Sequence, residues 1–197
     1  MSSYTIPYVV EKRPGSERAM DVFSRLLSDR IVYLGTAIDE GVANVLIAQL
    51  IHLESDNPDL PIHLYINSPG GDIPATLSVY DAMQYVRPPV ATTCLGQAAT
   101  TAALLLAGGA KGQRSILSHG RVVLHQPTGQ GRGTVPDLIL AADEIVRVRS
   151  QLEEVLSAHT GQSVETLRRD TDRELILDAE RAKAYGVVDH ILTERPD

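Results

Sequence analysis

Short apolar runs and longer helical patterns alternate along most of the chain. The runs with the length and composition of strands are Ile31–Gly35, Ile62–Asn67 and Val90–Leu95. The segments predicted to be helices are Glu40–Ser55, the stretch after the turn Ser68–Gly71 that ends near Val86, and the stretch after Thr100. Strand, turn and helix therefore recur as a unit, which predicts an α/β fold with helices packed over a sheet.

Residues Thr134–His159 show the clearest helical pattern. Thr134 with Asp137 predicts an N-terminal capping box, and Gly161 follows the predicted end of the helix. Apolar residues then recur at spacings of three and four, at Leu138, Ala141, Ile145, Val148, Leu152 and Val155, with a second stripe at Ile139, Ala142 and Val146. This pattern predicts either core packing within the chain or contact with another subunit.

Length and composition fit one domain, residues 1–197, with a substantial core. Residues 1–20 lack periodicity and contain Pro7, Pro14 and Gly15, which predicts an irregular N-terminal arm. A net charge of −7 without a basic block argues against nucleic-acid binding. We expect a cytoplasmic protein without membrane attachment, because no leader pattern or membrane-length apolar run is present and a lone cysteine, Cys94, excludes disulfides within the chain.

The segment Gly96–Ala103 is the first candidate for chemistry. An apolar strand, a glycine turn and a helix of small residues can present a nucleophilic hydroxyl at a helix start, and Thr100 is the hydroxyl at that point. His125 ends a second apolar run, Val122–Leu124, just before a glycine-rich loop, where catalytic side chains concentrate. A lone histidine in such a place is more often structural, so these residues alone leave both interpretations open.

The chain resembles the proteolytic subunits of Clp proteases, the ClpP family. The matching segments occur in the family's order and are Tyr8–Glu11, Glu17–Arg18, Ser24–Leu27, Arg30–Gly35, Tyr65–Gly71, Gly96–Thr100, His125–Pro127, His159–Gln162, Asp170–Arg173 and Tyr185–Leu192. The resemblance covers nearly the whole chain. It implies a ClpP/crotonase-like α/β fold of repeated strand-turn-helix units, with residues 134–160 as a protruding handle helix.

The resemblance also implies an active site for hydrolysing peptide bonds of unfolded proteins. By position, Thr100 is the nucleophile, His125 the general base and Glu174 the acid that orients the histidine. The backbone N–H groups of Gly71 and Thr101 would form the oxyanion hole. Such a serine-protease-like triad needs no metal or other cofactor.

Two of these positions depart from the family pattern. Thr100 stands in place of serine, and its extra methyl group restricts the χ1 rotamers available to the hydroxyl. Glu174 stands in place of aspartate, with Asp170 and Asp172 as alternative acids. The sequence therefore supports two interpretations equally: a working peptidase, or a weak or inactive ClpP paralogue that completes mixed rings beside an active subunit.

Further residues are implied to serve substrate and partner contacts. The expected strand that pairs with extended substrate is Gly129, Gln130 and Gly131; the expected contact between rings is Asp172 with Arg173; the expected docking positions for a Clp-type ATPase are Tyr65 and Tyr85. Ser115 stands where the family usually has an aromatic residue, which weakens the docking expectation. The implied assembly is two stacked heptameric rings, of one chain or with a paralogue, and ATP would be used by the separate ATPase.

Two other functions fit the sequence less well. A crotonase-type acyl-CoA enzyme shares the fold, but the paired glutamates of such enzymes are not evident here. The glycine-rich segment Gly129–Gly133 follows a strand and precedes a helix, but its spacing differs from that of a dinucleotide-binding loop.

Overall fold

The structure is a computed structural model that describes residues 5–13, 16–128 and 132–194. Within these ranges the helices are α1 (Val22–Ser28), α2 (Glu40–Asp56), α3 (Ile73–Tyr85), α4 (Thr101–Ala107), α5 (Val135–Thr160), α6 (Val164–Asp170) and α7 (Ala179–Tyr185). The strands of the main sheet are β3 (Ile31–Leu34), β4 (Ile62–Ser68), β5 (Val90–Ala99), β6 (Arg114–Leu117), β7 (Arg121–Leu124), β8 (Leu175–Leu177) and β9 (His190–Leu192). This alternation of strands and helices confirms the α/β prediction.

The main sheet is mostly parallel and is organised around β5. Strands β3, β4, β5, β6 and β9 lie side by side in that order. One edge of β5 pairs with β4, and the other edge pairs with two strands, because Thr92–Cys94 run beside β6 and Gln97–Ala99 run beside β7. Strand β7 also pairs with β8, in antiparallel fashion. The end of β5 therefore brings β7 and β8 to the point where the chain enters α4.

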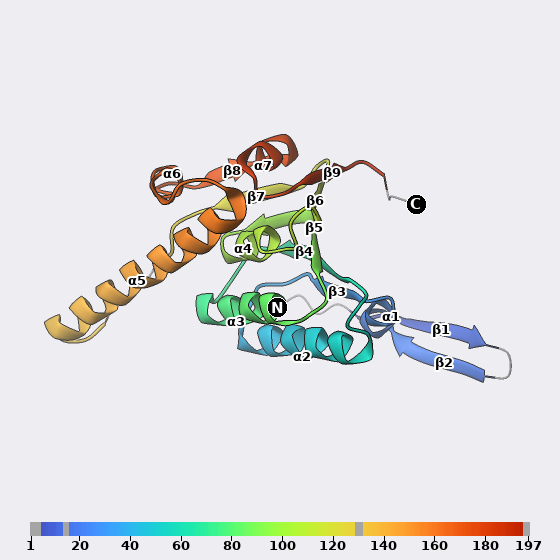
Figure 1. Ribbon diagram of the computed structural model, residues 1–197. Coiled ribbons are helices and arrows are strands. Elements are labelled where there is room, and N and C mark those ends of the chain that lie inside the picture. The colour runs from blue at the N-terminus through green and yellow to red at the C-terminus, as the bar shows by residue number, and fades with distance from the viewer. Residues whose placement is uncertain (1–4, 14–15, 129–131, 195–197) are drawn as a thin grey trace.

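The core lies between the sheet and the helices that cover it. Burial alternates along β4, with Ile62, Leu64 and Ile66 fully inside, as expected for a strand packed on one face. Helix α4 packs against β5, and α3 and α2 follow in turn (Figure 1). All seven residues of α4 are buried, so its short apolar sequence forms the centre of the core.

Helix α5 agrees closely with its prediction and extends away from the rest of the molecule (Figure 1). The N–H and the hydroxyl of Thr134 both donate to Asp137 Oδ2, at 2.8 and 2.6 Å, and Gly161 ends the helix with φ 76°. The inner half packs on the core through Leu152, Val155 and Leu156. In the outer half several large apolar side chains are exposed, namely Val135, Leu138, Ile139, Leu140 and Val146. No helix in the described ranges is both long and apolar enough to cross a membrane.

The prediction of an irregular arm over residues 1–20 was wrong for residues 8–13 and 16–20. Strands β1 (Tyr8–Arg13) and β2 (Ser16–Asp21) form an antiparallel hairpin that projects on the side of the molecule opposite α5 (Figure 1). Neighbouring residues Val9 and Val10 point to opposite faces of the strand, yet both are exposed. Burial therefore imposes no apolar alternation on this part of β1, and periodicity could not reveal the strand.

A buried ion pair holds the C-terminal strand and the inner end of α5 to the core. Arg114 donates to both carboxylate oxygens of Asp189, at 2.9 and 2.6 Å, and Nη1 of Arg114 donates to the carbonyl groups of Ala107 and His159. Nε2 of His159 in turn shares a hydrogen bond of 2.8 Å with the hydroxyl of Tyr80, and the two rings lie edge to face. One residue, Arg114, thus connects β6 with the ends of α4 and α5.

We predict that protonation of His159 destabilises this junction. Burial, and then the charge of Arg114, lower the pKa of His159 below its usual value near 6.5. A group with a lowered folded-state pKa contributes stability above the unfolded-state pKa, and this contribution is lost as the pH falls. The free energy of unfolding, measured with urea between pH 8 and 5, should therefore fall more steeply below pH 6.5 in the wild type than in His159→Gln. Replacement of the exposed His52 by glutamine should keep the wild-type pH dependence, and equal slopes for the wild type and His159→Gln would contradict the prediction.

Candidate active site

Thr100 occupies a strained turn between β5 and α4. Its backbone has φ 50° and ψ −114°, a conformation that β-branched residues rarely adopt and that costs about 1–3 kcal/mol. Its N–H donates to the carbonyl of Val123 on β7 at 2.8 Å. The side chain is exposed at the end of a strand and the start of a helix, which is the geometry of a nucleophile elbow.

The predicted turn Ser68–Gly71 lies directly against Thr100. The hydroxyl of Ser68 donates to the carbonyl of Thr36 at 2.6 Å and accepts the N–H of Gly70 at 3.1 Å, which fixes the turn. Gly70 has φ +86°, and any side chain there would collide with Thr100 Oγ1. Glycine is therefore required at this position both by its backbone conformation and by the close approach of the hydroxyl.

The pairing of β7 with β8 brings His125 and Glu174 to neighbouring positions. Leu124 lies opposite Leu175 in the antiparallel register, at the point where both strands end, so His125 and Glu174 are the residues that adjoin this last pair. The N–H of Gln126 donates to the carbonyl of Thr171 at 3.2 Å and continues the contact. His125 is half-buried and Glu174 is exposed.

Thr100 and His125 line the same cavity. Its volume is about 350 Å³, and its apolar wall is formed by Ile73, Pro74, Leu124, Leu152, Leu156 and Leu167. Glu174 does not line this cavity. The structure thus brings two of the three predicted triad residues to one cavity, whereas the third adjoins the end of β8 outside it.

The hydrogen bonds of the site are those of a resting state. The hydroxyl of Thr100 donates to the carbonyl of Pro69 at 3.2 Å. The N–H of Gly71, a predicted oxyanion donor, donates to the hydroxyl of Thr101 at 2.9 Å. Within the described residues, His125 makes no hydrogen bond to Thr100 or Glu174 through its ring. Catalysis would require Thr100 Oγ1 to turn toward His125 and the N–H of Gly71 to become available.

The sequence analysis assigned a role to the backbone N–H of Thr101 but none to its side-chain hydroxyl. The Thr101 hydroxyl is held in a buried network, in which it shares a hydrogen bond of 3.0 Å with the hydroxyl of Thr76. Thr76 is fully buried on α3 and also contacts the carbonyl of Asp72 at 2.7 Å. The signal was present, because a hydroxyl at the first turn of a helix readily binds nearby backbone N–H groups.

The other predicted residues lie away from the cavity. Tyr65 on β4 is half-buried beside Tyr33 and Thr93, whereas Tyr85, at the end of α3, is 84% exposed. Ser115 is buried on β6. Asp172 and Arg173 are exposed in the connection between α6 and β8. The predicted substrate-pairing residues Gly129, Gln130 and Gly131 lie outside the described residues.

Neither metal nor thiol chemistry is indicated in the described part of the chain. The described ranges hold no group of three histidine, cysteine or acidic side chains that could bind a metal ion. Burial raises the pKa of the Cys94 thiol to about 11, so the thiol stays protonated at neutral pH and is a poor nucleophile.

Comparison with known proteins agrees with this geometry. A sequence model of the Clp protease family matches residues 14–195. The chain belongs to the Clp protease family. It is 60% identical over 192 residues to the ATP-dependent Clp protease proteolytic subunit 4 of Rhodococcus jostii, which covers 98% of this chain and 99% of the relative. It is 59% identical over 196 residues to proteolytic subunit 1 of Nocardia farcinica (99% and 100% covered) and 58% identical over 196 residues to proteolytic subunit 2 of Streptomyces avermitilis (99% and 98% covered).

Family membership confirms the resemblance that the motifs indicated and the fold expected from it. Clp proteases are serine-type peptidases, so a nucleophilic hydroxyl is the chemistry of the family. A hydroxyl is retained at position 100, but as a threonine.

We predict that Thr101→Val loosens the N–H of Gly71. Valine has the shape of threonine without the hydroxyl, so this N–H loses its acceptor. One such hydrogen bond contributes about 0.5–1.5 kcal/mol, which corresponds to exchange of this amide hydrogen about two- to tenfold faster. Hydrogen exchange followed by mass spectrometry with fragmentation across residues 68–72 measures the rate.

Thr76→Val is the matched control for this measurement, because it also removes a buried hydroxyl but leaves the acceptor of Gly71 in place. Equal exchange of the Gly71 amide in the two variants would show that the Thr101 hydroxyl does not hold it.

Proposed function

We propose that this chain is a proteolytic-chamber subunit of a Clp-type ATP-dependent protease. In this proposal it hydrolyses peptide bonds of unfolded polypeptides, with Thr100 as nucleophile, His125 as general base and Glu174 as orienting acid. The observation that carries the proposal is that Thr100, on its strained turn, and His125 line one cavity. The names of the relatives support the same function.

The reaction would follow the usual steps of acyl transfer. Oγ1 of Thr100 attacks the substrate carbonyl carbon while His125 takes the hydroxyl proton, and Glu174 stabilises the imidazolium that forms. The N–H groups of Gly71 and Thr101 donate to the oxyanion. His125 then gives the proton to the leaving amine, and water hydrolyses the threonine ester with His125 again as base. No cofactor takes part in these steps.

The assembly belongs to the same proposal. The exposed apolar outer half of α5 is an area that a monomer rarely leaves in water, which supports the handle that joins two stacked heptameric rings. Asp172 and Arg173 are exposed, as a contact between rings requires. Tyr65 and Tyr85 are proposed to dock a separate Clp-type ATPase, which uses the ATP, directly or through a paralogue. The cytoplasm is the proposed location.

The resting geometry favours a second candidate function. Thr100 Oγ1 is bound to the carbonyl of Pro69, and the N–H of Gly71 is occupied by Thr101. A subunit that remains in this arrangement would be a weak or inactive paralogue that assembles with an active serine-bearing subunit. The two candidates share the fold and the assembly but differ in the reactivity of Thr100.

We predict that a fluorophosphonate or β-lactone probe distinguishes them. If the chain is catalytic, the purified wild type is labelled at Thr100, and Thr100→Ser is labelled faster by on the order of tenfold to a hundredfold, because serine lacks the methyl group that hinders the productive rotamer. If the chain is an inactive companion, the wild type stays unlabelled and Thr100→Ser gains labelling. Mass spectrometry of the labelled peptide gives the site and the rate.

Thr100→Ala and His125→Ala provide the controls. Labelling elsewhere in Thr100→Ala, or peptidase activity that persists in it, would remove Thr100 from the mechanism. Labelling of Thr100→Ser that does not depend on His125 would remove His125 from its role as base.

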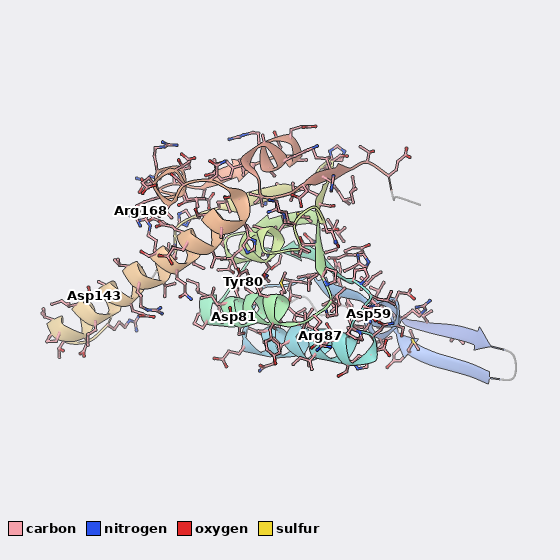
Figure 2. All side chains as sticks on the ribbon, in the orientation of Figure 1. Asp59, Tyr80, Asp81, Arg87, Asp143 and Arg168 are labelled. Carbon is pink, nitrogen blue, oxygen red and sulfur yellow. The ribbon has the colours of Figure 1, made fainter. Side chains whose placement is uncertain are left out.

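We predict that the outer half of α5 holds the assembly together. The double substitution Ile139→Glu with Leu140→Glu places two charges on exposed apolar positions and should shift the protein toward smaller species in sedimentation velocity. Asp143→Asn, on the same exposed part of α5 (Figure 2), should leave the distribution unchanged. A wild-type chain that sediments as a monomer at micromolar concentration, alone and with its paralogue, would contradict the proposed rings.

A further inference from the structure

One wall of the cavity carries charge. Helix α5 contributes Arg149 and Glu153 to the cavity lining, beside Leu152 and Leu156. Glu153 is only 4% exposed, which makes it the one charged residue of α5 that is buried in the described structure. A buried carboxylate must be paired to be tolerated, and Glu153 is paired twice.

Two guanidinium groups hold Glu153. Nε of Arg149 donates to Oε1 at 2.7 Å, and Arg168 on α6 donates to Oε2 through Nε and Nη2, at 3.1 and 2.6 Å. Burial opposes ionisation of Glu153, but the hydrogen bonds from Arg168 and Arg149 outweigh it and hold the pKa below its usual value. The group therefore contains one negative and two positive charges at neutral pH, a net charge of +1.

The two arginines have different surroundings. Arg168 ties α6 to α5 without lining the cavity, whereas Arg149 lines it. The Arg149 side chain is 24% exposed, and its Nη2 donates to the carbonyl of Arg168 at 3.3 Å. Its Nη1 has no hydrogen-bond partner among the described residues. Arg149 thus uses Nε and Nη2 to bind Glu153 and α6, and its Nη1 remains as a donor that a ligand in the cavity can use.

We propose that Arg149 is a specificity-determining residue that selects substrates with a glutamate side chain in this cavity. The apolar wall formed by Ile73, Leu152 and Leu156 accommodates the aliphatic stem, and the guanidinium of Arg149, oriented by Glu153, donates to the carboxylate at its tip. Glutamine, which has the same length and an oxygen acceptor but no charge, ranks second, and leucine third. The proposal rests on the proposed peptidase function, since it assigns this cavity to the residue before the scissile bond.

The test is a series of fluorogenic peptides that differ only in having Glu, Gln or Leu before the scissile bond. A charged hydrogen bond of this kind contributes about 1.5–3 kcal/mol, so the Glu:Leu ratio of kcat/KM should fall about tenfold to a hundredfold in Arg149→Met. Methionine preserves the length and packing of the stem without the charge. Arg168→Met, which removes the other guanidinium, should keep the wild-type ratio. Thr100→Ser serves as the parent chain if the wild type turns over too slowly.

A binding measurement separates failure of this proposal from failure of the peptidase function. Thr100→Ala cannot react, yet its cavity should bind a blocked product peptide ending in Glu at least tenfold more tightly than one ending in Leu, and Arg149→Met in that parent should abolish the difference. An unchanged Glu:Leu preference after Arg149→Met, in turnover or in binding, would overturn the specificity role and leave Arg149 as packing for Glu153. If no variant turns over peptide but binding still shows a preference for Glu that depends on Arg149, the peptidase function alone would be refuted.

Discussion

Strand β5 runs directly into a helix whose seven residues are all buried, and the chain has one residue, Thr100, in which to change direction. Because α4 fills the centre of the core, its position cannot relax to relieve the turn, and Thr100 takes a positive φ despite its branched side chain. Its N–H is fixed by Val123 on β7, the strand that ends beside His125. The same buried helix therefore positions the candidate nucleophile and, through the pairing of β5 with β7, the candidate base.

Threonine at this turn affects whether its hydroxyl binds the carbonyl of Pro69 or turns toward His125. The backbone conformation is fixed by the fold, so only rotation about χ1 can move Oγ1 from the carbonyl of Pro69 toward His125. In serine the β-carbon carries only hydrogen atoms beside the hydroxyl during this rotation. In threonine a methyl group takes the place of one of them. A β-carbon added to Gly70 would collide with Thr100 Oγ1, so Gly70 and the Thr100 side chain are already in close contact. Steric restriction, more than a loss of intrinsic reactivity, distinguishes this site from a serine site.

The features that local sequence chemistry controls were predicted well. The capping box at Thr134 and the glycine end of α5 follow from side chains within a few residues of each helix end, and the strands and turns around Thr100 follow from apolar runs and glycine. The features that depend on contacts distant in sequence were not. The ends of β7 and β8, next to His125 and Glu174, are brought together by a strand register, and the bond from Gly71 to Thr101 joins residues 30 apart.

Helix α5 joins two roles that the sequence pattern alone could not separate. Its inner half lines the cavity and is tied to α6 through Glu153, while its outer half exposes the apolar side chains that we assign to assembly. A helix is stiff over this length, so a force on the outer half moves the inner half with it. Arg149 and Leu152 would then shift relative to Thr100, which is fixed to the core by α4 and β7. If the outer half joins the proposed rings, a load on it would therefore reach the wall of the cavity through this one helix.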